Sequence, residues 1–266
     1  METHAQEFHK APGHGWTHYL FEFLMLFLAV FCGFLAENLR EFSAERRKEK
    51  EYVLSMIDDL KRDTANFRSQ LNLSQRALTS ADTLINLLRP ILKKNETSAM
   101  YYHARVLTIS ISPFEIFDRT YSQMKSSGNL TLFKSKKIAD SVTAYYYDQT
   151  RLANQQSFIS NLILAYMQNV SAVFHGYVFQ QMAYARGLGP YYNAPAATKT
   201  VFDIPRPEGN PPLADESPRS IDMLEGSVHY LYSRILSART IIRSESERAT
   251  RLIKFLTKSY RLKGNL

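Results

Sequence analysis

The chain contains 266 residues, of which 45% are hydrophobic and 12% aromatic, and its net charge is +8. This composition excludes an intrinsically disordered chain and supplies enough apolar residues for one or two domains with a core. The single cysteine, Cys32, excludes an intrachain disulfide framework and a cysteine-based metal site. Glycine and proline are scarce, at ten residues each, which favours long helices with few interruptions.

Residues 1–18 form a tail that contains Pro12, Gly13, Gly15 and four histidines. We expect this tail to be flexible. No cysteine or carboxylate pattern accompanies the histidines, so we predict no metal site. The segment also lacks the strongly basic start and the cleavage site of a classical signal peptide.

The stretch 19–36, YLFEFLMLFLAVFCGFLA, is the one long apolar run in the sequence. A helix needs roughly 17–25 apolar residues to cross the ~30 Å hydrocarbon core of a bilayer. Trp16 and Tyr19 are aromatic residues of the kind found at membrane interfaces. The run therefore predicts a transmembrane anchor. A buried core helix of a soluble protein is disfavoured, because the run is apolar on all sides.

Glu22, Ala29 and Gly33 follow helical spacing and form one stripe along the predicted anchor. Ala29 and Gly33 are a small-xxx-small pair, which lets two helices approach closely in lipid. Glu22 is the one charged residue of the run, and such residues usually face a partner or water. We predict that the stripe is a packing surface of the anchor. Two interpretations of Glu22 remain, a carboxylate at headgroup level and a proton or ion pathway.

Two signals about orientation disagree. Basic residues between Arg40 and Lys50 outnumber Lys10 before the run, and the positive-inside rule then places the bulk of the chain in the cytoplasm. The absence of cysteine after Cys32 favours an exported domain instead. We expect a single-pass protein of a bacterial cytoplasmic membrane, with the bulk of the chain outside the cytoplasm.

Residues 37–89 are dense in charge and keep a helical pattern. From Val53 to Leu88 the apolar positions alternate in steps of four and three, as in coiled coils and helical bundles. Pro90 ends the helix because it lacks an N–H donor. We predict a stalk helix continuous with the anchor, with the adjacent acids Asp58, Asp59 and Asp63 on its solvated face.

Residues 90–134 predict short helices and a turn. The stretch 99–111 permits a helix or an extended segment, and Pro113 suits the first turn of a helix that Gly128 ends. Residues 135–185 follow a second heptad series and predict one long helix. Gln149 and Gln156 fall at its core positions, where they need buried partners and can fix the helix register.

Residues 186–218 contain seven prolines and predict a long loop, which at this length is functional or mobile. Residues 219–266 form the most regular heptad helix of the chain, between Ile221 and Leu256. These segments predict an all-α fold. We expect an N-terminal transmembrane helix continuous with a long heptad stalk, packed in an elongated up-down helical bundle.

The last turns of the final helix carry candidate headgroup-binding residues: Arg251, Lys254, Lys258, Arg261 and Lys263. If the long helices alternate in direction, these residues return to the start of the stalk. Anionic lipid attracts each nearby basic residue by about 1 kcal/mol. A favourable interaction with the helix dipole is the alternative. Nucleic acid is an unlikely partner, because stacking aromatics are not interleaved with these charges.

Two segments of the sequence carry a resemblance: FLAENLRE at 34–41 with the charged helix after it, and YSQMKSSGNLTLFKSKKIADSVTAYY at 121–146. The chain resembles a family of uncharacterised bacterial single-pass membrane proteins, known as a domain of unknown function. The resemblance covers most of residues 17–150 and, more loosely, the final helix. It implies an anchor and a helical extramembrane domain, and it brings no catalytic residues.

Within the resembling segment, residues 121–130 depart from heptad spacing. We therefore single out a family-like corner, made of Tyr121, Lys125, Ser127, Gly128 and Asn129. Its alternative interpretation is a tight helix–turn–helix corner with a structural role.

The sequence contains no phosphate-binding glycine loop, HExxH or CxxC motif, so we predict no enzymatic activity and no cofactor. We expect an oligomeric, membrane-anchored helical scaffold or interaction protein. Its expected partners are the lipid bilayer and a second copy or another membrane protein. One alternative is a ligand-binding sensor or accessory subunit of a membrane complex. Another is a proton- or ion-conducting ring of anchors that uses Glu22.

Overall fold

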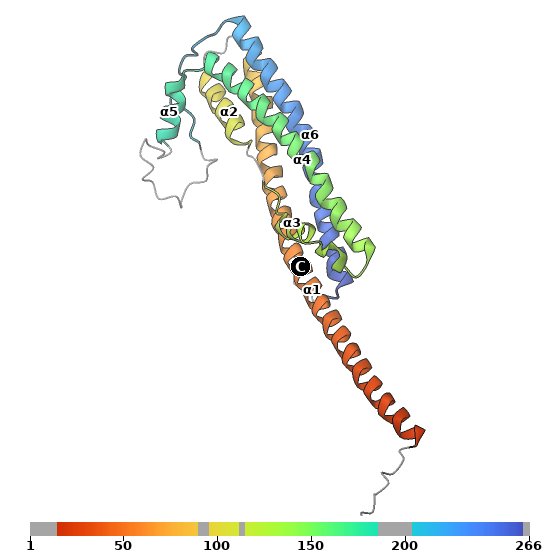
Figure 1. Cartoon of the computed structure of the whole chain (residues 1–266). Helices are drawn as coiled ribbons and strands as arrows, with labels where there is room; N and C mark the ends of the chain where they lie inside the picture. The colour runs from red at the N-terminus through yellow and green to blue at the C-terminus, as the bar shows by residue number, and fades with distance from the viewer. Residues whose placement is uncertain (1–14, 90–95, 112–114, 186–203, 263–266) are drawn as a thin grey trace, which may run out of the picture. The chain divides into compact units, whose positions relative to one another are not determined.

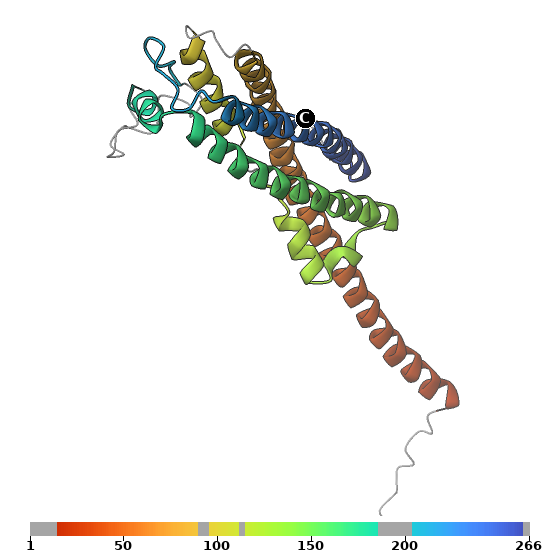
Figure 2. The ribbon, with the colours of Figure 1, turned by 90° about the horizontal axis from the view of Figure 1, so that it is seen from above.

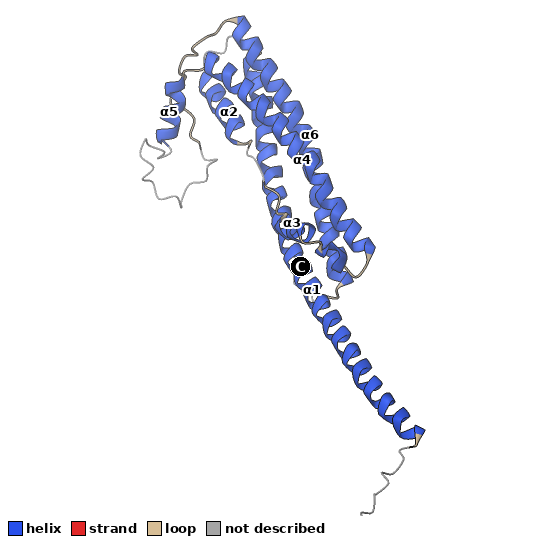
Figure 3. Ribbon diagram, viewed as in Figure 1, coloured by secondary structure: helices blue, strands red, loops and turns tan. Residues whose placement is uncertain are grey.

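The structure is a computed structural model that describes residues 15–89, 96–111, 115–185 and 204–262. Every regular element in these ranges is helical, and they contain no strand (Figure 3). The predicted all-α fold is thereby confirmed. The chain divides into two compact units, residues 1–51 and residues 52–266.

Helix α1, Trp16–Leu88, contributes to both units. It is the one regular element described in the first unit, where its residues from Trp16 to Phe42 are all exposed. Residues 16–18 of the predicted flexible tail belong to this helix, and Gly15 precedes it. Residues 1–14, with three of the four tail histidines, lie outside the described residues.

The second unit contains the rest of α1 and the remaining helices (Figure 1). These are α2 (Thr97–Ile109), α3 (Arg119–Ser126), the 3₁₀ turn η2 (Asn129–Leu132), α4 (Lys136–Val173), α5 (Gly176–Ala185) and α6 (Pro218–Ser259). The stretch 99–111, for which the sequence permitted two interpretations, is mostly helical because it belongs to α2.

Two hydrophobic clusters fill the second unit and show how its long helices run. One cluster combines Val53 of α1, Ile138 of α4 and Leu256 of α6. The other combines Leu88 of α1, Phe174 after α4 and Leu224 of α6. Therefore α1 and α4 run in the same direction and α6 returns against them, as the colours of Figures 1 and 2 show for α4 and α6. We call the cluster with Val53 the lower core and the cluster with Leu88 the upper core.

Between α1 and α4 the chain returns from the upper core to the lower core through two short helices, α2 and α3. Helix α2 begins in the upper core, where Tyr101 and Ala104 are fully buried. Helix α3 supplies Met124 to the lower core. The chain thus runs up through α1, down through α2 and α3, up through α4 and down through α6. The first downward segment is not one continuous helix.

Heptad spacing explains which faces of the long helices are buried. All eleven heptad positions of α6 between Ile221 and Leu256 are buried, including the polar Glu245. On α4 the same pattern buries residues from Ile138 to Val173, with partly buried positions in its middle. Amphipathic spacing therefore accounts for the packing of these two helices.

The predicted single helix over 135–185 is wrong, because the chain breaks between α4 and α5. Phe174 is extended, with φ −113° and ψ 140°. The carbonyl of Val173 accepts a hydrogen bond from the Ala214 N–H at 2.9 Å. The His175 N–H donates to the Tyr101 hydroxyl at 3.0 Å. These contacts come from distant segments and satisfy the backbone groups that a helix break leaves unpaired.

The predicted helix start at Pro113 is also wrong. Residues 115–118 are not helical, and α3 begins at Arg119. Gly128 does end the segment, with a positive φ of 70° that glycine tolerates without strain. The physical cause of the late start lies in α1, whose buried carboxylates bind residues 117–120, as described below.

The described part of the predicted loop, residues 204–217, lies against the bundle. The Pro212 carbonyl accepts a hydrogen bond from the Tyr101 hydroxyl at 2.9 Å, and the Pro207 carbonyl accepts one from the Ser98 hydroxyl at 2.8 Å. Ser217 then caps α6 by accepting a hydrogen bond from the Ser220 N–H, with Pro218 at the first helical position. Residues 186–203 lie outside the described residues.

Candidate functional site

The apolar stretch of α1 lies on the surface of the first unit. It is the one segment in the described residues that forms a continuous helix long and apolar enough to cross a membrane, and none of its most apolar window is buried. A signal sequence near an N-terminus can also form a helix of this length and apolar composition. Glu22, Ala29 and Gly33 are all exposed, and a Cβ placed on Gly33 would meet no atom within 4 Å. The stripe is therefore open to a partner.

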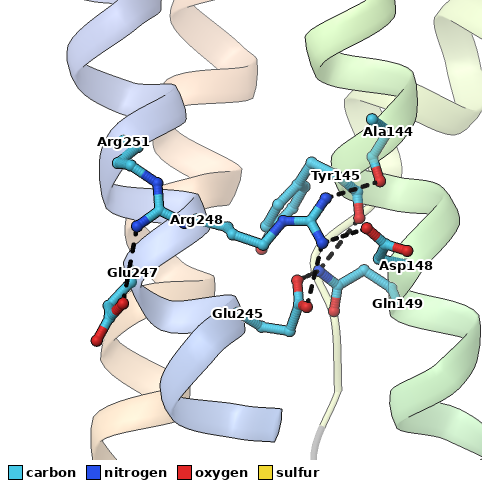
Figure 4. Close-up of polar contacts among 8 residues, drawn as sticks. All are labelled: Ala144, Tyr145, Asp148, Gln149, Glu245, Glu247, Arg248 and Arg251. Carbon is cyan, nitrogen blue, oxygen red and sulfur yellow. Dashed lines mark hydrogen bonds and ion pairs between the residues drawn. The ribbon is translucent and has the colours of Figure 1, made fainter.

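The candidate headgroup-binding residues gather at the end of α6. Arg251, Lys254 and Lys258 are exposed on its last turns, and Arg261 is exposed just after it. Lys263 lies outside the described residues. Arg251 forms an exposed ion pair with Glu247 at 3.7 Å on its own helix (Figure 4). In the described parts of the chain, no carboxylate pairs with Lys254, Lys258 or Arg261.

The structure adds lysines that sequence reasoning missed, because they belong to a distant segment. Lys134, Lys136 and Lys137 lie at the start of α4, beside the end of α6. The Lys134 ammonium donates to the Ser259 carbonyl and lies 4.3 Å from the centre of the Tyr260 ring. Lys137 lies over the Phe255 ring. We call these three lysines, together with Lys254, Lys258 and Arg261, the basic end.

One feature of the sequence could have drawn attention to these lysines, namely their position at the start of a helix. A helix N-terminus carries a partial positive charge, so lysines in its first turn oppose the helix dipole. The carbonyl of Ser259 accounts for Lys134, whereas Lys136 and Lys137 are exposed at the start of α4. A cluster of like charges is unfavourable unless anions lie near it. The basic end therefore has the electrostatic character of an anion-binding surface.

Further along the same two helices, a polar layer joins α4 to α6 (Figure 4). Arg248 extends from α6 to α4, where its guanidinium pairs with Asp148 and donates to the Ala144 carbonyl at 3.4 Å. Glu245 lies in the same layer and accepts a hydrogen bond from the Gln149 amide at 3.3 Å. These contacts pair the Gln149 amide N–H group, whereas its side-chain carbonyl oxygen is buried without a partner. They agree with the register role expected for Gln149. Arg248 is neutralised here, so we leave it out of the basic end.

The family-like corner is a tight turn held by its own side chains. Gly128 lies between α3 and η2, and the Asn129 amide donates to the hydroxyls of Ser127 at 2.7 Å and Tyr52 at 3.0 Å. Tyr121 stacks on Tyr146 with ring centroids 4.4 Å apart. Lys125 is exposed. These contacts fit the structural interpretation of the corner, and a functional role for it stays a prediction.

Two stalk carboxylates expected on a solvated face are instead buried. Asp59 is 2% exposed and Asp63 is 1% exposed, whereas the neighbouring Asp58 is exposed as predicted. Asp59 accepts hydrogen bonds from the Thr120 N–H at 3.1 Å and the Thr120 hydroxyl at 2.5 Å. It thereby satisfies one of the free N–H groups at the start of α3. This explains why α3 begins where it does.

Asp63 holds the residues just before α3. It accepts a hydrogen bond from the Phe117 N–H at 2.8 Å and another from the Tyr145 hydroxyl at 2.8 Å. Burial raises the pKa of Asp63 to about 6, although both hydrogen bonds oppose this shift. Burial and the nearby Asp63 also raise the pKa of Tyr145 above its usual value. Through these two hydrogen bonds, Asp63 links α1 to α4 and to the segment before α3.

The described residues contain no group of three or more histidine, cysteine or acidic side chains placed to hold a metal ion. Comparison with known proteins adds no further assignment, because no family model, curated protein or solved structure matches the chain. The arrangement therefore offers two surfaces with a defined chemistry. One is the exposed apolar stretch of α1, and the other is the basic end.

Proposed function

We propose that this protein is a membrane-anchored helical scaffold whose extramembrane unit presents a basic surface to anionic lipid. The exposed apolar stretch of α1 carries the proposal. An isolated helix with this much exposed apolar surface is strongly unfavourable in water, and it is stable in a bilayer because its backbone hydrogen bonds are internal. We also propose that the chain is related to the single-pass bacterial membrane proteins that it resembles. The proposed role involves no enzymatic step.

The basic end supports contact with anionic headgroups. Leu256 of α6 and Ile138 of α4 pack in the lower core with Val53, the first core residue after the charged segment that follows the apolar run. The basic end thus lies beside the lower core, at the end of the second unit where its part of α1 begins. Each basic residue that reaches an anionic membrane surface contributes about 1 kcal/mol, and salt weakens this attraction.

The contact can be measured with the full chain in lipid nanodiscs. In a Cys32→Ser background, a fluorophore on Thr257→Cys reports quenching by lipids with a nitroxide on the headgroup. We expect stronger quenching in discs with 30% phosphatidylglycerol than in phosphatidylcholine discs. We also expect high salt, or the triple change Lys254→Glu, Lys258→Glu and Arg261→Glu, to remove the difference.

The matched control is the triple change Arg68→Glu, Arg219→Glu and Arg243→Glu. These arginines are also exposed and lie outside the basic end, so the control changes the net charge equally. Equal quenching in both kinds of disc, or an equal loss in both triple variants, would refute specific contact by the basic end.

We further propose that the anchor associates with a second copy or with another membrane protein through Glu22, Ala29 and Gly33. The open space around Gly33 supports a close approach of another helix. A ring of anchors that conducts protons or ions through Glu22 requires this same association, so it depends on the same experiment, which is described in the Discussion.

A further inference from the structure

The core of the second unit is interrupted by a cavity between the upper core and the lower core. Its volume is about 90 Å³. Side chains of α1, α4 and α6 and of the two residues after α2 meet around it. Its walls include Ile163 and Ile235 on the upper side and Leu152 and Ile242 on the lower side. Ser160, which is exposed, also lines it, so the cavity reaches the surface. Helical bundles commonly place ligand sites between facing helices in this way.

Polar atoms without partners line this cavity. The hydroxyl of Ser110, which is 2% exposed, and the side-chain carbonyl oxygen of Gln155 are both buried and form no hydrogen bond in the structure. Leaving a buried polar atom without a partner is energetically unfavourable. Native proteins normally satisfy such atoms with water, an ion or a ligand. Ser110 can donate or accept a hydrogen bond, and the Gln155 oxygen requires a donor.

A partly buried cation completes the lining. The Arg239 guanidinium of α6 donates to the Ser74 hydroxyl at 3.0 Å and to the Leu71 carbonyl, both on α1. These acceptors are neutral. In the described ranges no carboxylate forms an ion pair with Arg239. A guanidinium has five N–H donors in a planar fork that matches a carboxylate, and these two contacts use only Nη1. The three remaining donors favour an anionic ligand.

We propose that this cavity binds a small organic acid, a carboxylate of two or three carbon atoms that carries a hydroxyl or amino group. The carboxylate pairs with Arg239, the second polar group donates to Gln155, and the short carbon chain lies against the isoleucine side chains. The size restricts the ligand, because about 90 Å³ corresponds to about three water molecules at ~30 Å³ each and is smaller than the ~150 Å³ cavity that holds benzene. This assignment goes beyond the scaffold role, which does not require a ligand.

The test uses the purified full chain in nanodiscs and a panel of glycolate, L-lactate and L-alanine. Binding is measured by calorimetry and by the thermal unfolding midpoint. We expect at least one of these acids to bind saturably and to raise the midpoint by about 5 °C or more at 100 times its dissociation constant. Lactamide, which has the shape of lactate without its charge, should not bind.

Variants separate this site from binding elsewhere. Arg239→Gln should weaken binding at least tenfold, and Arg243→Gln, an exposed neighbour outside the cavity, should leave it unchanged. Ala238→Leu fills the cavity from α6 and should abolish binding while keeping the unfolding midpoint at or above that of the natural chain. This second variant gives an answer even if Arg239→Gln does not fold.

Three results would overturn the proposal. One is that no acid in the panel binds. Another is that an acid binds equally to the Ala238→Leu variant. The third is that lactamide binds as tightly as lactate, because the cavity would then not select a carboxylate. The headgroup experiment uses different residues and a different readout, so the two proposals can fail independently.

Discussion

At the scale of single residues, the buried carboxylates of α1 organise the segment that leads into α3. Asp59 and Asp63 are held by Thr120, Phe117 and Tyr145, from segments far along the chain. Heptad spacing in α1 does not reveal them, because that pattern identifies the face toward α4 and α6. A second face is covered by residues 115–120. Only the folded chain shows that this cover exists.

The raised pKa of Asp63 predicts a pH dependence of stability. Asp63 binds its proton more tightly in the folded chain, where its pKa is about 6, than in the unfolded chain, where it keeps the usual value of 3.8. Asp63 therefore increases the free energy of unfolding as the pH falls from about 6 toward 4. Above about pH 6 this increase is absent. Asp59, Asp118 and Tyr145 surround it, and the two acids reinforce the raised pKa.

Asp63→Asn should remove this dependence. Between pH 7 and pH 4.5 the natural chain should gain about 2 kcal/mol in its free energy of unfolding relative to this variant. Urea denaturation of the full chain at both pH values measures the difference. Asp58→Asn is the matched control, since Asp58 is exposed, and it should follow the natural chain. A pH profile of Asp63→Asn that parallels the natural chain contradicts the assignment.

At the scale of elements, hydrophobic periodicity predicted the long helices well. The α6 heptads were correct at every position. The α4 heptads hold up to Val173 and then fail, since Tyr177 is half exposed on a separate helix. Non-local hydrogen bonds stabilise the break, since the His175 N–H donates to the Tyr101 hydroxyl and the Ala214 N–H donates to the Val173 carbonyl. The lysines at the start of α4 were missed for a similar reason, because their neighbours lie in another part of the sequence.

The anchor stripe yields a prediction at this same scale. Cys32 lies next to Gly33 on α1 and is exposed. If anchors associate through Ala29 and Gly33, oxidative crosslinking of the full chain in membranes should give a covalent dimer. Ala29→Leu with Gly33→Leu should reduce it at least several-fold, because the bulky side chains hold the helices apart. Val30→Leu is the control, on another face of the helix. If no crosslinked species forms, both anchor-driven self-association and a conducting ring are excluded.

At the scale of the whole molecule, we propose a bacterial cytoplasmic membrane protein with its helical unit outside the cytoplasm. Glu208 is exposed in the described part of the segment before α6, so Glu208→Cys in a Cys32→Ser background provides a surface thiol. A membrane-impermeant maleimide should label it in intact spheroplasts, as completely as in lysed ones. Labelling only after lysis would place the unit in the cytoplasm, in line with the positive-inside rule.

The central claim is that the apolar stretch of α1 is a retained membrane anchor. The most direct measurement is alkaline carbonate extraction of bacterial membranes that contain the full chain, followed by mass analysis of the extracted protein. We expect the chain to stay in the membrane pellet with its apolar stretch intact. Leu26→Arg with Val30→Arg should release it, because each arginine at the centre of a span costs about 2.5–3.5 kcal/mol. A natural chain found in the carbonate supernatant, or shortened by loss of residues 19–36, would contradict the claim.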